Sequence, residues 1–346
     1  MIVKKILIFN PSFIGDAVLT TPLLKICKDY FTNVQIHFCV RYGYEKLFIG
    51  LPFIDRIISF DKRAADKGIK GIFKLRQIIK EQKYEFIICP HRSMRSALIV
   101  NLNKAQVTVG FGGTAFSFLF KKRVPRNLQL HEVYRNLQLL KPLMEDDFGN
   151  VIKSVDKLYV AENKKYYGKF KYFTDVIKDS SKLVGIQATS NWKTKMWPLE
   201  RFAALINKLY EYDIISVLFS SAKELNIIEN MSQYINVPFI NLAGLLELDE
   251  LSSAIKNMDL FITNDTGPMH IAAAHQIPVV AIFGPTVPEF GFAPFGCTHK
   301  IIEDPTLDCR PCSLHGGNRC PKKHFKCMLN LTIDRVLENA LDLLNR

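Results

Sequence analysis

Short apolar segments alternate with longer amphipathic segments through the first half of the chain. The apolar segments hardly alternate with polar residues, which is typical of strands buried on both faces of a sheet. We therefore expect strands at residues 3–9, 34–40, 54–60, 86–89 and 107–110, and helices at residues 16–30, 68–82 and 94–102. Repetition of this kind predicts a parallel sheet covered by helices on both faces.

The alternation stops between residues 142 and 179 and then begins again. The interruption contains an acidic run, a Gly149-Asn150 turn signal and a polar run at 162–165, so we expect a domain boundary there. Beyond it, strands are expected at residues 183–187, 214–219, 239–242, 260–263 and 279–283, and helices at residues 199–210, 223–235, 248–256, 269–275 and 331–344.

The predicted fold class is α/β, with two Rossmann-like doubly wound domains facing a cleft. We place the first domain at residues 1–165 and the second at residues 166–330, followed by a C-terminal helix at residues 331–346. In folds of this kind the ligands bind at the carboxyl ends of the strands.

An anion-binding position is predicted where the strand at 260–263 leads into the next helix. Residues 264–267 are turn and cap residues, and Pro268 suits the first helical position because its missing N–H would be unpaired there. The N–H groups and the dipole of a helix N-terminus attract phosphate, and Gly267 allows a ligand to approach the backbone closely. An ordinary capped connection explains the same residues equally simply.

Composition adds a strong positive charge to an otherwise ordinary globular balance. The 346 residues suggest about two domains, and 48% hydrophobic with 23% charged residues excludes a disordered or fibrous chain. The net charge of +13 favours an anionic ligand or an anionic membrane surface. The lysines are scattered rather than clustered, so we expect no nucleic-acid partner.

The N-terminal residues predict a strand rather than an export signal, because their apolar run is short and no small-residue cleavage site follows. No apolar run reaches the roughly 18 residues that a membrane-spanning helix needs. We therefore expect a cytoplasmic protein whose eight cysteines are reduced thiols.

Asp16 is the candidate general base. It lies in the loop at residues 10–16, which leaves the carboxyl end of the first strand. A carboxylate there can accept a proton from a sugar hydroxyl as that hydroxyl attacks. The alternative is that Asp16 caps the following helix, and Pro22 predicts a kink or a later helix start at Thr21.

The segment from Gly110 to Ala115 matches the dinucleotide-binding pattern G-x-G-x-x-A, which would suit a nicotinamide-dependent oxidoreductase. The acidic residue of that pattern ends the next strand, whereas Glu132 begins a helical pattern. We therefore keep an oxidoreductase only as a weaker alternative.

Several loops of the second domain follow strands and carry ligand-binding chemistry. Thr194 and Lys195 could hold a diphosphate, because lysine presents a compact positive charge. The segments 219–224 and 241–244, with Glu224, Leu242 and Gly244, could form the walls around a nucleoside. Solvated lysines and plain turns explain the same residues if no ligand binds.

Four cysteines near the C-terminus have the spacing C-x2-C-x7-C-x6-C. These are Cys309, Cys312, Cys320 and Cys327. They could bind a structural zinc, but the spacing differs from the common zinc-finger patterns. We favour a reduced cluster packed in a loop.

Taken together, the motifs resemble glycosyltransferase family 9, the bacterial ADP-heptose:lipopolysaccharide heptosyltransferases, and within it the heptosyltransferase II type. The resemblance covers nearly the whole chain and is most specific at residues 264–270 together with residues 283–286. The other segments that carry it are 10–16, 90–98, 131–133, 194–198, 218–224 and 241–244.

The resemblance implies a glycosyltransferase B fold and an inverting single displacement that requires no cofactor and no metal in the active site. Asp16 would be the base, and the first domain would bind the acceptor through Ser12, Gly15, His91, Arg92 and Arg95. The second domain would bind the ADP-heptose donor through Thr194, Lys195, Glu224, Leu242, Gly244, Asp265, Thr266, Gly267 and His270. Lys195 would neutralise the leaving diphosphate, whereas Asp265 would bind sugar hydroxyls, because a carboxylate repels phosphate.

The expected acceptor is the lipopolysaccharide inner core, with the protein acting as a monomer, peripheral at the inner-membrane surface. Two alternatives remain open at this point. One is a family 9 transferase for another nucleotide sugar, since one or two side chains decide hydroxyl stereochemistry. The other is a nucleotide-sugar-binding protein without activity, against which the position of Asp16 argues.

Overall fold

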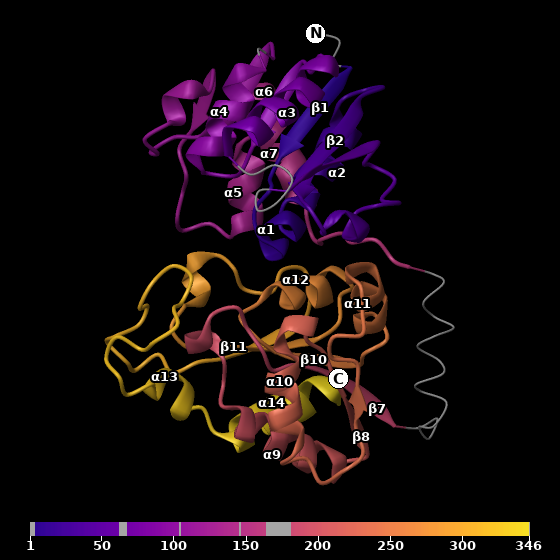
Figure 1. Ribbon diagram of the computed structural model, residues 1–346, viewed down its shortest axis with the longest axis vertical. Helices are drawn as coiled ribbons and strands as arrows, with labels where there is room; N and C mark the ends of the chain where they lie inside the picture. Colours follow the sequence, from indigo (N-terminus) through magenta and orange to yellow (C-terminus); the bar gives the residue numbers. More distant parts are fainter. Residues whose placement is uncertain (1–3, 62–67, 104, 145–146, 164–180, 346) are drawn as a thin grey trace. The chain divides into compact units, whose positions relative to one another are not determined.

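The computed structural model describes residues 4–61, 68–103, 105–144, 147–163 and 181–345. The chain divides into two compact units, residues 1–161 and 162–346. In the described part, each unit holds a six-stranded parallel sheet with helices between the strands (Figure 1). The domain boundary expected at residues 165 and 166 lies outside the described residues.

The sheet of the first unit has the strand order β3-β2-β1-β4-β5-β6. Its strands are β1 Lys5–Phe9, β2 Gln35–Arg41, β3 Arg56–Phe60, β4 Phe86–Cys89, β5 Val107–Phe111 and β6 Lys122–Val124. The α-helices are α1 Ile14–Val18, α2 Thr21–Tyr30, α3 Gly68–Glu81, α4 Met94–Leu102, α5 Glu132–Gln138, α6 Lys141–Met144 and α7 Phe148–Val151.

The sheet of the second unit has the order β12-β11-β10-β7-β8-β9. Its strands are β7 Lys182–Gln187, β8 Ile214–Leu218, β9 Ile240–Asn241, β10 Leu260–Asn264, β11 Val279–Ile282 and β12 His299–Ile302. The α-helices are α9 Leu199–Tyr210, α10 Leu225–Ser232, α11 Leu248–Ile255, α12 Gly267–Ala274, α13 Lys326–Leu329 and α14 Ile333–Leu344.

Burial on both faces explains the continuous apolar strands. In β1, Ile6 pairs in register with Ile36 of β2 and with Phe86 of β4, and all of Ile6 to Phe9 is fully buried. A strand in this position has no solvent-facing side, so polar residues do not alternate along it. The predicted α/β class with two doubly wound sheets is thereby confirmed.

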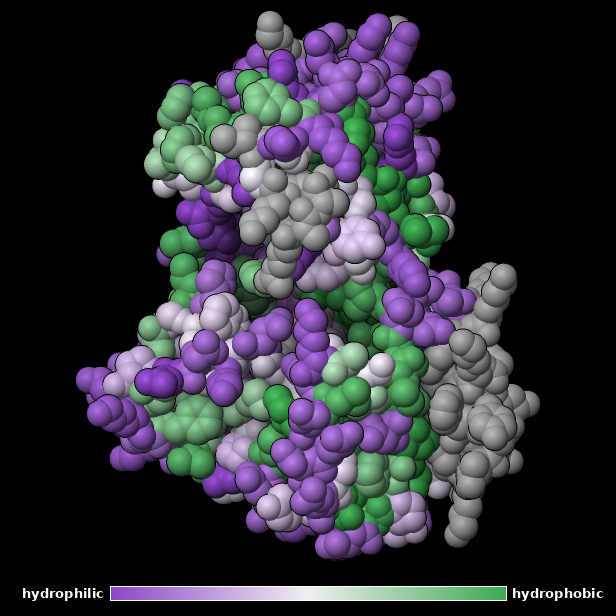
Figure 2. Space-filling model, in the orientation of Figure 1, coloured by the Kyte–Doolittle hydropathy of each residue, from purple (hydrophilic) through white to green (hydrophobic). Residues whose placement is uncertain are grey.

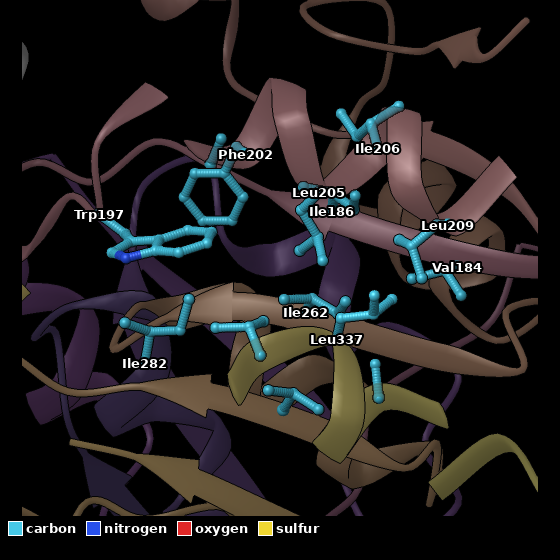
Figure 3. Packing of buried hydrophobic residues seen from close by; sticks show 14 of the residues in the cluster. Val184, Ile186, Trp197, Phe202, Leu205, Ile206, Leu209, Ile262, Ile282 and Leu337 are labelled. Atoms are coloured by element: carbon cyan, nitrogen blue, oxygen red, sulfur yellow. The ribbon is translucent and has the colours of Figure 1, made fainter. Parts of the chain in front are cut away.

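The core of the second unit reaches the loop that carries the candidate lysine. Trp197 is fully buried, stacks edge-to-face on Phe202 of α9 with ring centroids 5.0 Å apart, and donates its indole N–H to Leu331 O at 3.0 Å (Figure 3). Burial of a ring this large together with a satisfied N–H fixes the backbone around it. The segment just before Trp197 is therefore held firmly on the sheet.

Helix boundaries near the first strand differ in detail from the expected ones. The helical segment predicted at residues 16–30 is two helices, because α2 begins at Thr21 with Pro22 in its first turn. This confirms the later start that Pro22 suggested. The shorter α1 begins at Ile14 with Phe13 as its N-cap residue, so the alternative in which Asp16 caps the helix is wrong.

Two edge strands, β6 and β12, were not predicted. The first is only three residues long, with Lys122 and Arg123 exposed, and it therefore lacks an apolar pattern. The second begins with His299 and Lys300, and within the described part of the chain it pairs with β11 alone. Strands at a sheet edge tolerate polar residues, which hides them from a search for apolar runs.

Hydrophilic and hydrophobic residues are interspersed over the face shown in Figure 2. Among the described residues, no helix is both long enough and apolar enough to cross a membrane.

Candidate active site

The loop that carries Asp16 is fixed by polar contacts with Asn10. The Asn10 amide donates to Thr20 Oγ1 at 2.7 Å and to Asp16 O at 3.3 Å, and it accepts from Ser12 Oγ at 2.6 Å. Thr20 Oγ1 in turn donates to Asp16 O at 2.8 Å. These bonds hold the last turn of the loop and the first turn of α1, which includes Gly15, in one conformation.

The Asp16 carboxyl has a raised pKa. Burial is the largest cause and the negative charge of Glu132 is the second, and together they raise the pKa from 3.8 to about 6. Hydrogen bonds from the Phe13 backbone and from Ser12, and the charge of Arg126, act in the opposite direction. At neutral pH such a carboxylate is mainly ionised and is more basic than an ordinary aspartate, which suits a general base.

The other acceptor-side candidates follow β4, which pairs directly with β1. His91 Nδ1 lies 2.7 Å from Ser96 Oγ, so its ring is oriented by α4. The pKa of Arg92 is lowered by burial, then by the charge of Arg126. Arg95 lies in the first turn of α4. Ser12 and Asp16 follow β1, and His91 and Arg92 follow the neighbouring strand β4. The fold thus brings these four residues to the carboxyl ends of two adjacent strands.

Lys195 lies against Asp265 in the second unit. Its Nζ is 2.5 Å from Asp265 Oδ2, and both side chains are about nine-tenths buried. Thr286 Oγ1, from the loop after β11, donates to the same carboxylate oxygen at 2.7 Å. The sequence assigned Lys195 to phosphate and Asp265 to sugar without anticipating that the two side chains form an ion pair.

Asn264 joins the lysine loop to the end of β10. Its side chain is fully buried, accepts from Trp197 N at 3.0 Å and donates to Ala188 O at 2.8 Å. The next residues begin α12, with Thr266 as the N-cap residue, Gly267 first and Pro268 second in the helix. The sequence had placed Pro268 at the first position of this helix, whereas it occupies the second. Asp265 therefore directly precedes the N-cap residue of α12 in the sequence.

The remaining donor-side candidates have different structural surroundings. Glu224 accepts from Ser221 N at 3.1 Å and Oγ at 2.7 Å, so its carboxylate belongs to a capping box. Leu242 is buried and its N–H bonds Leu218 O, while Gly244 adopts a φ of +70° beside Leu225. His270 is buried one turn into α12.

Sequence reasoning missed the contribution of the cysteine-rich segment to this region. Thr194 Oγ1 donates to Gly317 O at 2.8 Å and lies 2.8 Å from Gly317 N, which donates to it. A Cβ on Gly316 would lie 3.0 Å from Lys195 Cγ. His315 also interacts electrostatically with Lys195, because its pKa is lowered first by burial and then by the positive charge of Lys195. The adjacent glycines at 316 and 317 were the available signal.

The four clustered cysteines do not form a recognisable metal site. Cys309 Sγ is 3.9 Å from His324 Nε2, and Cys312 Sγ donates to Cys309 O at 3.2 Å. Across the described residues, no group of three or more His, Cys, Asp or Glu side chains has the geometry to hold a metal ion. None of the eight cysteines, all of which lie among the described residues, forms a disulfide.

The glycine-rich segment at residues 110–115 has a packing role. A Cβ on Gly110 would lie 2.4 Å from the Phe120 ring, so only glycine fits beneath it. The segment leads through a single 3-10 turn, η2 Ser117–Leu119, into β6 rather than into an α-helix. A dinucleotide-binding turn needs a helix N-terminus at that point, which disfavours the oxidoreductase alternative.

Known proteins of similar sequence span the whole chain. The Campylobacter jejuni protein called lipooligosaccharide heptosyltransferase 2 is 26% identical over 358 residues, covering 98% of both chains. Lipopolysaccharide heptosyltransferase 2 of Escherichia coli K12 is 25% identical over 350 residues, covering 97% of this chain and 98% of the relative.

Solved structures share the fold. A family 9 glycosyltransferase from Veillonella parvula superimposes with a TM-score of 0.84 and 23% identity, covering 100% of this chain and 99% of that one. The Escherichia coli ADP-heptose lipopolysaccharide heptosyltransferase II gives a TM-score of 0.77 and 22% identity, covering 99% and 98%. The architecture is therefore that of the glycosyltransferase B fold.

The family model described as glycosyltransferase family 9 (heptosyltransferase) matches residues 72–323, which include strands β4 to β6 of the first sheet and strands β7 to β12 of the second. Because this family model matches most of the chain and the relatives align over nearly its whole length, the chain belongs to glycosyltransferase family 9 and is a glycosyltransferase.

Proposed function

We propose that this enzyme moves a heptose from ADP-heptose to a hydroxyl of the lipopolysaccharide inner core, by an inverting single displacement. The relatives named above are called lipooligosaccharide or lipopolysaccharide heptosyltransferases, and another family member from Escherichia coli is solved with ADP and with ADP-2-deoxy-2-fluoro heptose. The observation that carries the proposal is the partly buried Asp16 carboxylate, which has a raised pKa and lies at the carboxyl end of β1.

In this proposal Asp16 accepts the proton of the acceptor hydroxyl as the oxygen attacks the anomeric carbon. The bond between that carbon and the diphosphate oxygen breaks, and ADP leaves with the electron pair. The configuration inverts because attack and departure occur on opposite faces. The proton ends on Asp16 and passes to solvent, so no cofactor is consumed.

Lys195 and the N-terminus of α12 would stabilise the negative charge that develops on the diphosphate. A lysine nine-tenths buried interacts more strongly with an anion than an exposed lysine does, because less water screens it. Asp265 would then serve both as the partner that positions Lys195 and as an acceptor for sugar hydroxyls. The nucleotide of the donor would contact the remaining donor-side candidates, which are Thr194, Glu224, Leu242, Gly244, Thr266, Gly267 and His270.

On the acceptor side, Ser12, Gly15, His91, Arg92 and Arg95 would contact the lipid-linked sugar. Arginine pairs well with carboxylate and phosphate, which are groups that an inner-core acceptor presents. The net charge of +13 would favour attachment at the anionic cytoplasmic face of the inner membrane, with the enzyme acting as a monomer.

Replacement of Asp16 by Ala tests the catalytic assignment. We expect transfer to fall by about 100-fold or more, since a general base contributes at least that much, while ADP-heptose binding stays nearly unchanged. Transfer is measured as ADP release with a purified inner-core acceptor, and binding by calorimetry. Full activity of Asp16→Ala would contradict the assignment.

Replacement of Lys195 by Ala tests the donor assignment. Loss of a charge-assisted contact should weaken ADP binding by about 10-fold to 100-fold. Lys193→Ala is the matched control, because Lys193 lies two positions away on the same loop but is exposed. Equal ADP affinity in the two variants would refute the role of Lys195. A panel of nucleotide sugars, scored by ADP or other nucleotide release, decides which sugar is transferred.

A further inference from the structure

Glu132 is a buried carboxylate that the roles above leave unused. It is the first residue of α5 and is only 8% exposed. Its Oε2 atom accepts from Arg126 Nη2 at 2.5 Å and from Arg135 Nη1 at 2.9 Å. A buried carboxylate is costly unless it is paired, so these two contacts hold the Glu132 side chain in place.

Arg135 holds the segment that carries Arg126. Its Nε donates to Asn127 O at 3.0 Å and its Nη2 donates to Leu128 O at 2.5 Å, and the side chain is 2% exposed. The guanidinium of Arg126 also lies over the Phe111 ring, 5.8 Å from its centroid. Arg126 is therefore fixed by Glu132 on one side and by an aromatic ring on another, on a segment anchored to α5.

Helix α5 is attached to the element that carries Asp16. The Asn136 side chain donates to Leu19 O at 3.3 Å, directly after the end of α1, and is itself buried. Both Glu132 and Arg126 act on Asp16 electrostatically and in opposite directions, Glu132 raising its pKa and Arg126 lowering it.

Arg92 also interacts electrostatically with Arg126, Glu132 and Arg135. The loop after β4 contributes Arg92, whose pKa is lowered by burial, then by Arg126, with Glu132 opposing and Arg135 adding to the decrease. Ser12 contributes a hydrogen bond to Asp16 from the β1 loop. Among these groups, Glu132 supplies the negative charge that opposes the arginines.

We propose that Glu132 is a positioning residue for the transfer reaction, which holds the Arg126 side chain in place and offsets the charge that Arg126 presents to the base. The inference rests on the proposed role of Asp16. An unpaired arginine beside a carboxylate favours the ionised form and makes the carboxylate a weaker base. Pairing Arg126 with Glu132 keeps the guanidinium in place without that loss of basicity.

Opposite changes in pH dependence test this role. The acid limb of the pH profile of kcat/KM reports the pKa of the base in the free enzyme. In Glu132→Gln the limb should move to lower pH by about one unit, because a repelling charge is lost and Arg126 is no longer neutralised. In Arg126→Gln it should move to higher pH by a smaller amount, because the charge of Arg126 has a weaker effect on the pKa of Asp16 than the charge of Glu132 has.

Glu85→Gln is the matched control. Glu85 precedes β4, at the opposite end of the strand from Arg92, and accepts from Lys5 N at 2.7 Å. Its removal should leave the acid limb in place. Thermal denaturation of each variant reports folding separately from pH dependence, and Arg126→Gln decides the question if Glu132→Gln does not fold.

Acid limbs that coincide with that of the wild type, or that move in the same direction in both variants, would overturn the inference and leave Glu132 with a purely structural role. Asp16→Asn separates this result from a failure of the proposed function. If Asp16→Asn is inactive while the limbs stay in place, only the inference about Glu132 fails. If Asp16→Asn is fully active, the base assignment itself has failed.

Discussion

The raised pKa of Asp16 predicts that the wild-type residue destabilises the folded enzyme at neutral pH. The carboxyl ionises near 3.8 in an unfolded chain and near 6 in the folded protein. Between these values the folded state keeps a proton that the unfolded state has lost, so stability falls as pH rises. Above about pH 6 both states are ionised, and the whole penalty is present.

Replacing Asp16 with the neutral, similarly shaped Asn should remove this penalty. Two pKa units correspond to about 3 kcal/mol, and that is an upper bound because Asp16 keeps some exposure to solvent. We expect Asp16→Asn to be more stable than the wild type by up to this amount at about pH 8. The two proteins should converge at about pH 4.

Urea unfolding of both proteins across this pH range, followed by tryptophan fluorescence and circular dichroism, measures the difference. Asp55→Asn is a control of opposite sign in the same unit. Burial raises the pKa of Asp55, but hydrogen bonds from Lys28 and from the Ile36 N–H outweigh burial and lower it overall. That substitution should destabilise the protein at neutral pH, with the loss fading as pH falls. A pH-independent difference between wild type and Asp16→Asn would refute the reasoning.

Two further predictions concern packing. In Gly185→Ala the new Cβ would lie 2.6 Å from the Phe261 ring, and we expect a loss of about 1–3 kcal/mol in unfolding free energy. Gly112→Ala is the control, because the nearest atom to its new Cβ lies 3.7 Å away and its stability should change little. Equal melting temperatures of the two variants would contradict this prediction. Thr194→Val removes the hydroxyl bonded to Gly317, so hydrogen exchange at the Gly317 amide should accelerate by about 5-fold to 30-fold, and unchanged exchange would show that the contact is not needed.

The sequence predicted the central strands of both sheets because their burial on two faces leaves a continuous apolar pattern. It predicted the break before α2 because Pro22 cannot donate a backbone N–H inside a helix. It did not predict the short edge strands β6 and β12, where exposure allows lysine and arginine into the sheet.

The candidate site was predictable as a set of loops but not as a set of contacts. Asp16 and Lys195 follow strands in recognisable motifs, so their positions at the sheet edges could be expected. The bond between Thr194 and Gly317 joins residues 123 apart, and the pair of Lys195 with Asp265 joins residues 70 apart. Contacts of this kind depend on the assembled sheet, and no local pattern encodes them.

The ion pair between Lys195 and Asp265 also bears on how the enzyme discriminates among anions. Because the ammonium already has a carboxylate partner, an incoming anion gains only the difference between two ion pairs. Chloride or acetate, with a single charge, gains little from this exchange of partners. In the proposed donor site a diphosphate would carry more charge and would contact both Lys195 and the N-terminus of α12, so it would compete with Asp265 where simple salts would not.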